Sequence, residues 1–138
     1  MARRELTVVT STMGGSLLDP SSSSTGGLMF TNNGRSFLGI TNAASSGGRR
    51  LVIGAAQLVD GDSLEVADRS IILGLACSSE DWEAILGPFR PSIYNQLSGT
   101  DVGKLYLDMA TTASSEADYT PLTAAQSSEL TFWVVTAP

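Results

Sequence analysis

Short runs of β-prone residues, separated by turn residues at intervals of about 8 to 12 positions, most constrain how this chain can fold. The runs begin at Phe30 and end with the strongest of them, Leu130–Thr136. One of the turns is Asn32-Asn33-Gly34, where positive φ angles are easily adopted. This spacing is typical of a small β-sandwich or barrel. It predicts an all-β body over residues 28–138.

Alternation of apolar and polar residues indicates which faces of these strands are buried. In the run 104–109, one face carries Leu105, Leu107 and Met109. The run Leu130–Thr136 is so apolar that we expect it to be paired and covered, because an exposed edge of that kind would aggregate.

At most one short helix is expected, over Ser78–Leu86. A serine ahead of several acids is how a short helix begins, since acidic side chains are favoured near its first turn. Gly87-Pro88-Phe89-Arg90-Pro91 would end this helix, because prolines remove amide donors and favour extended backbone. The small and polar residues 111–128 predict a long loop.

The first 27 residues do not have the pattern of a core. A β-prone run, Glu5–Thr10, precedes a segment with two glycine pairs, Pro20 and four consecutive serines. Structureless stretches longer than about 12 to 15 residues are mostly functional or disordered. Extended at roughly 3.3 Å per residue, such an arm would reach about 80 to 90 Å. Residues 1–27 are therefore expected to form an arm or linker, and both a docking arm and a disordered tail stay open.

The 138 residues suffice for one domain with one hydrophobic core, and their composition narrows the available chemistry. The chain has no histidine, one cysteine and one lysine. Acyl transfer by a serine would then need Lys104 as its base, which its place on an alternating strand does not favour. Cys77 cannot form an internal disulfide and is interpreted as a small core residue. We predict a protein that is not an enzyme and needs no cofactor.

Charge and hydropathy narrow the possible partners. The net charge of −6 argues against nucleic acid, because phosphate contacts need a basic face. No apolar stretch approaches the roughly 20 residues that cross a bilayer, and nothing marks the chain for export. The charge is uneven, since residues 1–59 carry five arginines and two acids, a net +3, and the remaining residues carry −9. This layout favours contacts between copies, with a simply solvated surface as the alternative.

Two acidic groups resemble functional sites but fail on spacing. Asp60-Gly61-Asp62 suggests calcium, yet an EF-hand loop counted from Asp60 would place Glu65 and Ile71 where it needs glycine and a carboxylate. Turn formation is the favoured interpretation there. The acids of Glu80–Glu83 are sequence neighbours that point in different directions, unlike the two separated carboxylates of a glycosidase. We predict no metal site and no catalytic residue.

Two blocks of sequence carry a resemblance to a known family. They are Asn-Asn-Gly-Arg-Ser-Phe-Leu at 32–38 and Gly-Pro-Phe-Arg-Pro-Ser-Ile-Tyr-Asn at 87–95, and the wider similarity covers most of residues 6–106. In these blocks the chain resembles small structural proteins of tailed bacteriophages, encoded near the major capsid protein and taken to be capsid decoration, or cement, proteins. The resemblance implies a β-sandwich or jelly-roll body that binds the outside of an icosahedral shell, commonly as an oligomer around a local symmetry axis.

From this resemblance we expect a structural virion protein that is made in the host cytoplasm and located on the capsid exterior. Its expected partners are the major capsid protein and further copies of itself, as a homotrimer or alternatively a dimer. The arm is expected to add a strand to a neighbour, with weaker contacts elsewhere. The expected contact residues are Arg3, Arg4, Leu6, Val8, Val9, Trp82 and Arg90.

A carbohydrate-binding or adhesin module on the virion surface is the alternative function. The β body and the aromatic residues Trp82 and Tyr94 motivate it, since exposed aromatic rings stack on sugars and also anchor protein interfaces. Loss of glycan binding in Trp82→Ala would favour this alternative, and tight binding to capsids without any glycan binding would reject it.

Overall fold

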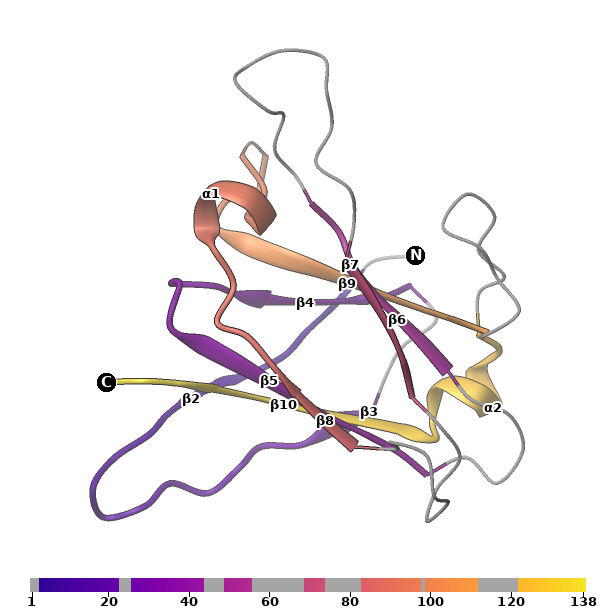
Figure 1. The fold of residues 1–138 in the computed structure, drawn as a ribbon, viewed down its shortest axis with the longest axis horizontal. Coiled ribbons are helices and arrows are strands. Elements are labelled where there is room, and N and C mark those ends of the chain that lie inside the picture. The colour runs from indigo at the N-terminus through magenta and orange to yellow at the C-terminus, as the bar shows by residue number, and fades with distance from the viewer. Residues whose placement is uncertain are drawn as a thin grey trace.

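The computed structural model arranges the chain in two layers of strands (Figure 1). The residues it describes are 3–22, 26–43, 49–55, 69–73, 83–97, 99–111 and 122–138. Over these residues the structure is a sandwich of two mixed sheets with two short helices. The all-β sandwich expected from the spacing of runs and turns is confirmed.

The first sheet has the strand order β1-β4-β9-β6-β7 among the described residues. Its strands are β1 (Arg4–Glu5), β4 (Leu28–Thr31), β9 (Lys104–Thr111), β6 (Arg49–Ile53) and β7 (Arg69–Leu73). β1 runs parallel to β4, and the other pairs are antiparallel. Leu105, Leu107 and Met109 of β9 are buried, as their alternation predicts.

The second sheet has the order β2-β10-β5-β8, with β3 also paired to β10. Its strands are β2 (Val8–Thr10), β3 (Ser21–Ser22), β5 (Ser36–Asn42), β8 (Glu83–Leu86) and β10 (Leu130–Thr136). β10 pairs with β5 along its whole length, while β3 and β2 share its other edge. The most apolar strand is therefore paired on both sides, as expected.

The core lies between the sheets and is built from both. Its fully buried members include Leu28, Phe30, Leu38, Ile40, Leu105, Leu107, Leu130, Phe132 and Val134. An ion pair adds a polar link, because Arg49 Nη2 of β6 lies 2.7 Å from Glu129 Oε2, just before β10. Arg49 is only 3% exposed, and a cation that deeply buried needs such a partner.

The N-terminal segment belongs to the body. Arg4–Glu5 pairs with β4 and Val8–Thr10 with β10, so one extended segment crosses from the edge of the first sheet to the edge of the second. Between them Leu6 enters the core at 3% exposure, and its amide donates to Met29 O at 2.8 Å. The expectation that the first residues stand apart from the core is wrong for this stretch. Burying a leucine contributes about 1.5 to 3 kcal/mol, and pairing covers the open edges of two sheets.

The described residues contain two short helices, where at most one was expected, over residues 78–86. The second of them lies in the stretch 111–128, which was expected to be a long loop. α1 (Pro91–Tyr94) starts with proline, whose missing amide costs nothing at that position. α2 (Ala124–Ser127) starts at a capping box in which Thr123 and Gln126 bond to each other's backbone amides.

The helix expected over residues 78–86 is wrong in its second half. Glu83–Leu86 forms β8, which pairs antiparallel with β5 from Thr41 to Leu38. Residues 78–82 lie outside the described part of the chain. The open edge of β5 offers backbone hydrogen bonds to residues 83–86, and this outweighs a weak local preference for helix.

Leu6→Ala tests whether the N-terminal crossing holds the sandwich together. The substitution should lower the free energy of unfolding by about 2 to 4 kcal/mol, because it removes buried methyl groups and leaves a cavity. Urea denaturation followed by circular dichroism measures this change. Thr7→Ala, at an exposed neighbouring position, is the matched control and should stay within about 0.5 kcal/mol of the parent. Equal effects of the two substitutions would contradict the placement of Leu6 in the core.

Candidate interaction surfaces

Arg3, an expected contact residue, is bound within its own chain. Its Nη1 and Nη2 lie 2.7 and 3.2 Å from the Asp108 carboxylate oxygens, and Nη1 donates to Leu107 O at 3.0 Å. The guanidinium also lies 4.2 Å from the centre of the Tyr106 ring. Gly27 makes room for it, because a Cβ there would collide with Arg3 Nη1. Arg3 therefore fastens the start of the chain to β9.

The other expected contact residues of the arm separate onto different surfaces. Leu6 lies in the core and Val8 packs against it. Arg4 is exposed at the edge of the first sheet. Val9 is half-buried in the second sheet, paired with Val135. Of these four, Arg4 and Val9 present their side chains outward.

Tyr106, beneath Arg3, shows how its neighbours tune an ionisable group. Its hydroxyl donates to Asp101 Oδ2 at 2.5 Å. This hydrogen bond raises the pKa of Tyr106 above its usual value, helped by burial and by the negative charge of Asp101, while the charge of Arg3 acts in the opposite direction. Tyr106 therefore stays protonated well above neutral pH and is not suited to act as a base there.

The two blocks of sequence that carry the family resemblance interlock at one end of the sandwich. Asn32 Nδ2 donates to Asn95 Oδ1 at 2.7 Å, and Asn95 Nδ2 donates back to Asn32 O at 2.9 Å. Asn32 also bonds to Phe89 O at 3.2 Å and accepts from Gly34 N at 3.1 Å. At 4% exposure, Asn32 satisfies backbone groups that would otherwise be buried without partners. We call this network the asparagine clasp.

Phe89 anchors the clasp in the core. It is 2% exposed, and its ring centroid lies 6.0 Å from that of Phe30 and 5.9 Å from that of Tyr94. Tyr94 meets Phe89 edge to face and is half-buried, so this ring is engaged in packing. Trp82, the other aromatic residue of the carbohydrate-binding alternative and an expected contact residue, lies outside the described residues.

Two exposed arginines flank the clasp. Arg35 follows Gly34 in the β4-β5 turn, and Arg90 precedes Pro91 at the start of α1. The two turns touch, since a Cβ at Gly34 would lie 3.2 Å from Pro91 Cδ. Arg90, an expected contact residue, is thus displayed at the clasp end, where Arg35 adds a second positive charge.

Asn95→Ala tests the clasp. Asn32 would keep its backbone bonds but lose both links to residue 95, leaving buried polar groups without partners. We expect a loss of about 1 to 3 kcal/mol in the free energy of unfolding, measured by urea denaturation. Ser92→Ala, an exposed position in the same block, is the control and should leave stability unchanged. A stability loss in Asn95→Ala no larger than in this control would show that the clasp contributes nothing.

Residues 11–20 project from the edge of the second sheet between β2 and β3 (Figure 1). Their base is fixed because Ser11 N donates to Thr136 O at 3.0 Å. Beyond it, Gly15 N donates to Thr12 O at 3.0 Å, and Thr12 Oγ1 donates to Gly15 O at 2.8 Å. Gly15 has a φ of 87°, which glycine adopts without strain. Hydrogen bonds therefore shape this projecting segment.

The projecting segment displays three large apolar side chains. Met13 and Leu17 lie almost fully in solvent, and Leu18 is 50% exposed. Each such side chain would gain about 1.5 to 3 kcal/mol if a partner buried it. The sequence patterns did not single out these residues, although three large apolar side chains in a glycine- and serine-rich stretch were a signal. Grouped exposed apolar side chains mark interaction sites, so this segment is a candidate contact.

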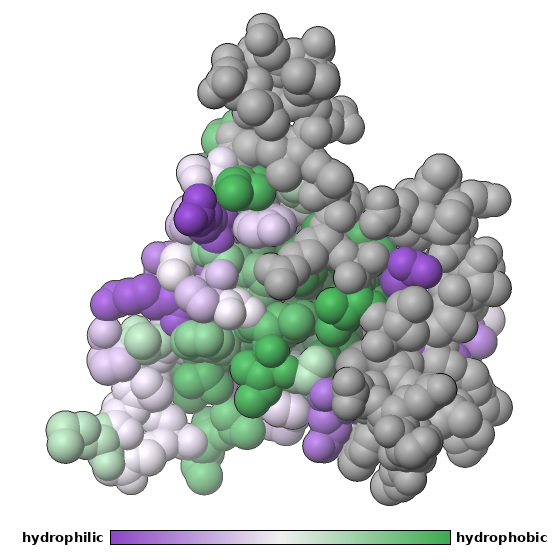
Figure 2. All heavy atoms as spheres, viewed as in Figure 1, coloured by the Kyte–Doolittle hydropathy of each residue, from purple (hydrophilic) through white to green (hydrophobic). Residues whose placement is uncertain are grey.

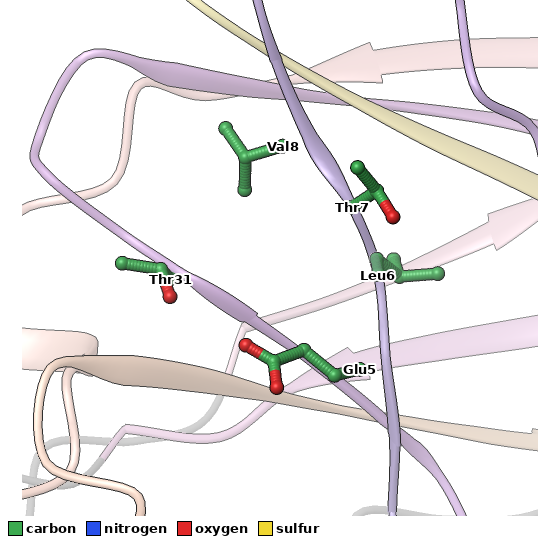
Figure 3. A pocket seen from close by; sticks show the side chains of 5 residues that line it. All are labelled: Glu5, Leu6, Thr7, Val8 and Thr31. Atoms are coloured by element: carbon green, nitrogen blue, oxygen red, sulfur yellow. The ribbon is translucent and has the colours of Figure 1, made fainter.

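A groove of about 390 Å³ lies beside the N-terminal crossing (Figure 3). It is lined by Glu5, Leu6, Thr7, Val8 and Thr31. Its carboxylate is already paired, since Glu5 Oε2 lies 3.0 Å from Lys104 Nζ. Small-molecule sites usually combine an enclosed apolar wall with several convergent polar groups, and this lining has few of either.

Comparisons with known proteins leave the surfaces as the main guide to function. The chain matches no family model, no curated protein and no solved structure. Among the described residues, no group of three or more His, Cys, Asp or Glu side chains could hold a metal ion. Neither described helix, at four residues each, is long enough to cross a membrane.

Proposed function

We propose that this chain is a capsid decoration protein, which binds the outer surface of an assembled phage head and stabilises the contacts between neighbouring capsomers. Its partner there is the major capsid protein, and its location is the exterior of the virion. The resemblance in the two interlocked blocks supports the proposal. The projecting segment, with Met13 and Leu17 held in solvent, is the observation that carries it.

The N-terminal crossing changes which residues are proposed to contact the shell. Leu6 and Val8 already pack within their own sandwich, so they do not serve a neighbour at the same time. In this proposal the shell contact is made instead by Met13, Leu17 and Leu18, which extend past the body. Arg4, at the edge of the first sheet, and Arg90, at the clasp end, are both exposed and add charged contacts on other parts of the surface.

The estimated binding free energies favour a coat in which many copies bind one shell together. Burial of the three apolar side chains would contribute about 5 to 9 kcal/mol. Association itself costs an estimated 4 kcal/mol or more, so a single contact of this kind is weak. A ligand that binds only the assembled shell still stabilises that shell by mass action, and linked copies bind more firmly than single ones.

The triple substitution Met13→Ser, Leu17→Ser and Leu18→Ser tests this proposal. Heads that lack the protein are mixed with the purified chain, and occupancy is measured by co-sedimentation over a concentration series. We expect at least about a tenfold loss of apparent affinity, because one lost apolar contact of about 1.4 kcal/mol already accounts for that factor. The unfolding midpoint of the free variant should change little, since Met13 and Leu17 lie almost fully in solvent and Leu18 is half exposed.

The matched control replaces two exposed apolar residues elsewhere, Leu97→Ser with Val102→Ser, at 67% and 57% exposure. This control should occupy heads as the parent does. Full occupancy by the triple variant would reject the projecting segment as the shell contact. Failure of the parent chain to bind any heads would reject the function itself.

A further inference from the structure

The outer face of the second sheet is apolar in its middle. In β5, Leu38 and Ile40 point into the core, so the alternate residues point outward, and the same alternation holds in β10. The apolar side chains of this outer sheet face are Val9, Phe37, Ile85, Trp133 and Val135. Ile85 is 74% exposed and Phe37 is 40% exposed. In Figure 2, hydrophobic side chains gather across the middle of the molecule, around the position of β8 in Figure 1.

Strand register arranges these side chains in two adjacent rows. One row is Val9, Val135 and Phe37, and the next is Trp133, Gly39 and Ile85. A Cβ at Gly39 would collide with the Trp133 indole, so this ring lies across the glycine. A shallow groove of about 300 Å³ separates it from Ile85. The middle of the outer sheet face is therefore apolar and low enough for another sheet to approach.

Opposite charges stand at the two ends of the same face. Arg35 directly precedes β5 and is exposed, and its Nη1 donates to Pro138 O at 2.8 Å, which holds the guanidinium at this end of the face. Glu83 is exposed on β8 and pairs with Thr41, near the end of β5. Six positions separate Arg35 from Thr41, which is about 20 Å at 3.3 Å per residue. The order of basic end, apolar middle and acidic end is complementary to itself when a second copy lies on it in reverse.

We propose that the outer sheet face binds a second copy of itself, with the strands of the two copies running in opposite directions. A twofold axis then crosses the strands near Trp133 and Val135. This axis keeps the strand order, so β5 lies over β5 of the second copy. Phe37 then lies over Gly39 and next to Ile85 of the second copy. Arg35 likewise lies over Thr41 and next to Glu83, because β8 is the neighbouring strand. Such an interface uses one patch twice, and sheets packed face to face in this way lie about 10 Å apart.

The size of the face sets the strength of the pair. The 21 residues of β2, β10, β5 and β8 (3, 7, 7 and 4), at about 3.3 Å along a strand and about 4.8 Å between strands, give a footprint of about 330 Å² per copy, below the roughly 800 Å² of a standard stable interface. A concentration-dependent dimer follows. The family resemblance implies a trimer instead, and the measured mass separates the two. This inference concerns the free protein and does not rest on binding to a shell.

Sedimentation equilibrium of the full chain over about 1 to 100 μM measures the association. The mean mass should rise with concentration from the 14.4 kDa of one chain toward twice that value. Phe37→Asp and Ile85→Asp should each weaken association at least about tenfold, because each buries an unpaired charge in the apolar middle. Val102→Asp, at an exposed apolar position away from the face, should associate as the parent does.

Charge reversal tests the orientation of the two copies. Arg35→Glu and Glu83→Arg should each weaken association, because like charges then meet at both ends of the interface. Mixing these two variants should restore association between them, since both contacts in the mixed pair are attractive again. A mass that stays at one chain at all concentrations, a mass of three chains, or no rescue on mixing would each overturn the proposal. None of these results alters the head-binding measurement, so the two proposals fail separately.

Discussion

The asparagine clasp is the interaction on which the arrangement of the second sheet depends. It joins the turn before β5 to the segment that follows β8, although Asn32 and Asn95 are 63 residues apart in the sequence. Asn32 and Asn95 exchange hydrogen bonds there, and Phe89 fixes the same segment in the core. β5 begins at this end of the sandwich and the antiparallel β8 ends there, so paired residues of the two strands lie side by side in rows across the sheet. The clasp, centred on the buried Asn32, therefore fixes the end of the β5–β8 pair from which the rows of the outer sheet face start.

Local pattern predicted the class of the fold but not the pairing of its first strand. Alternation in the runs 104–109 and Leu130–Thr136 depends only on neighbouring residues, and the burial of these strands followed it. The segment around Leu6 pairs parallel with β4 and β10, and parallel pairs have no connecting turn to mark them in the sequence. The helix predicted over Glu83–Leu86 was wrong for a related reason. The acids that favour a helix start are neighbours in the sequence, whereas the strand edge of β5 that pairs with these residues is distant in the sequence.

The candidate contacts were harder to predict than the fold. An apolar run that docks on a neighbour has the same alternation as one that docks on its own body. The sequence around Leu6 and Val8 therefore could not show which of the two they bind. The sequence also did not show whether Arg3 binds its own chain or a neighbour. Its partners Tyr106 and Asp108 lie more than 100 residues away and come next to Arg3 only in the folded sheet. Met13 and Leu17 have no periodicity at all. Exposure, which depends on the whole fold, is what distinguishes them.

The two proposed surfaces meet at β2 and would act together. Val9 lies on the outer sheet face, and two positions later Ser11 begins the projecting segment. A twofold axis that crosses the strands leaves the β2 edges of both copies on the same side, so both projecting segments extend from one edge of the pair. Two linked contacts bind with an effective concentration in the millimolar range for short connections. A weak dimer would therefore be reinforced on a shell that binds both segments, because each contact increases the occupancy of the other.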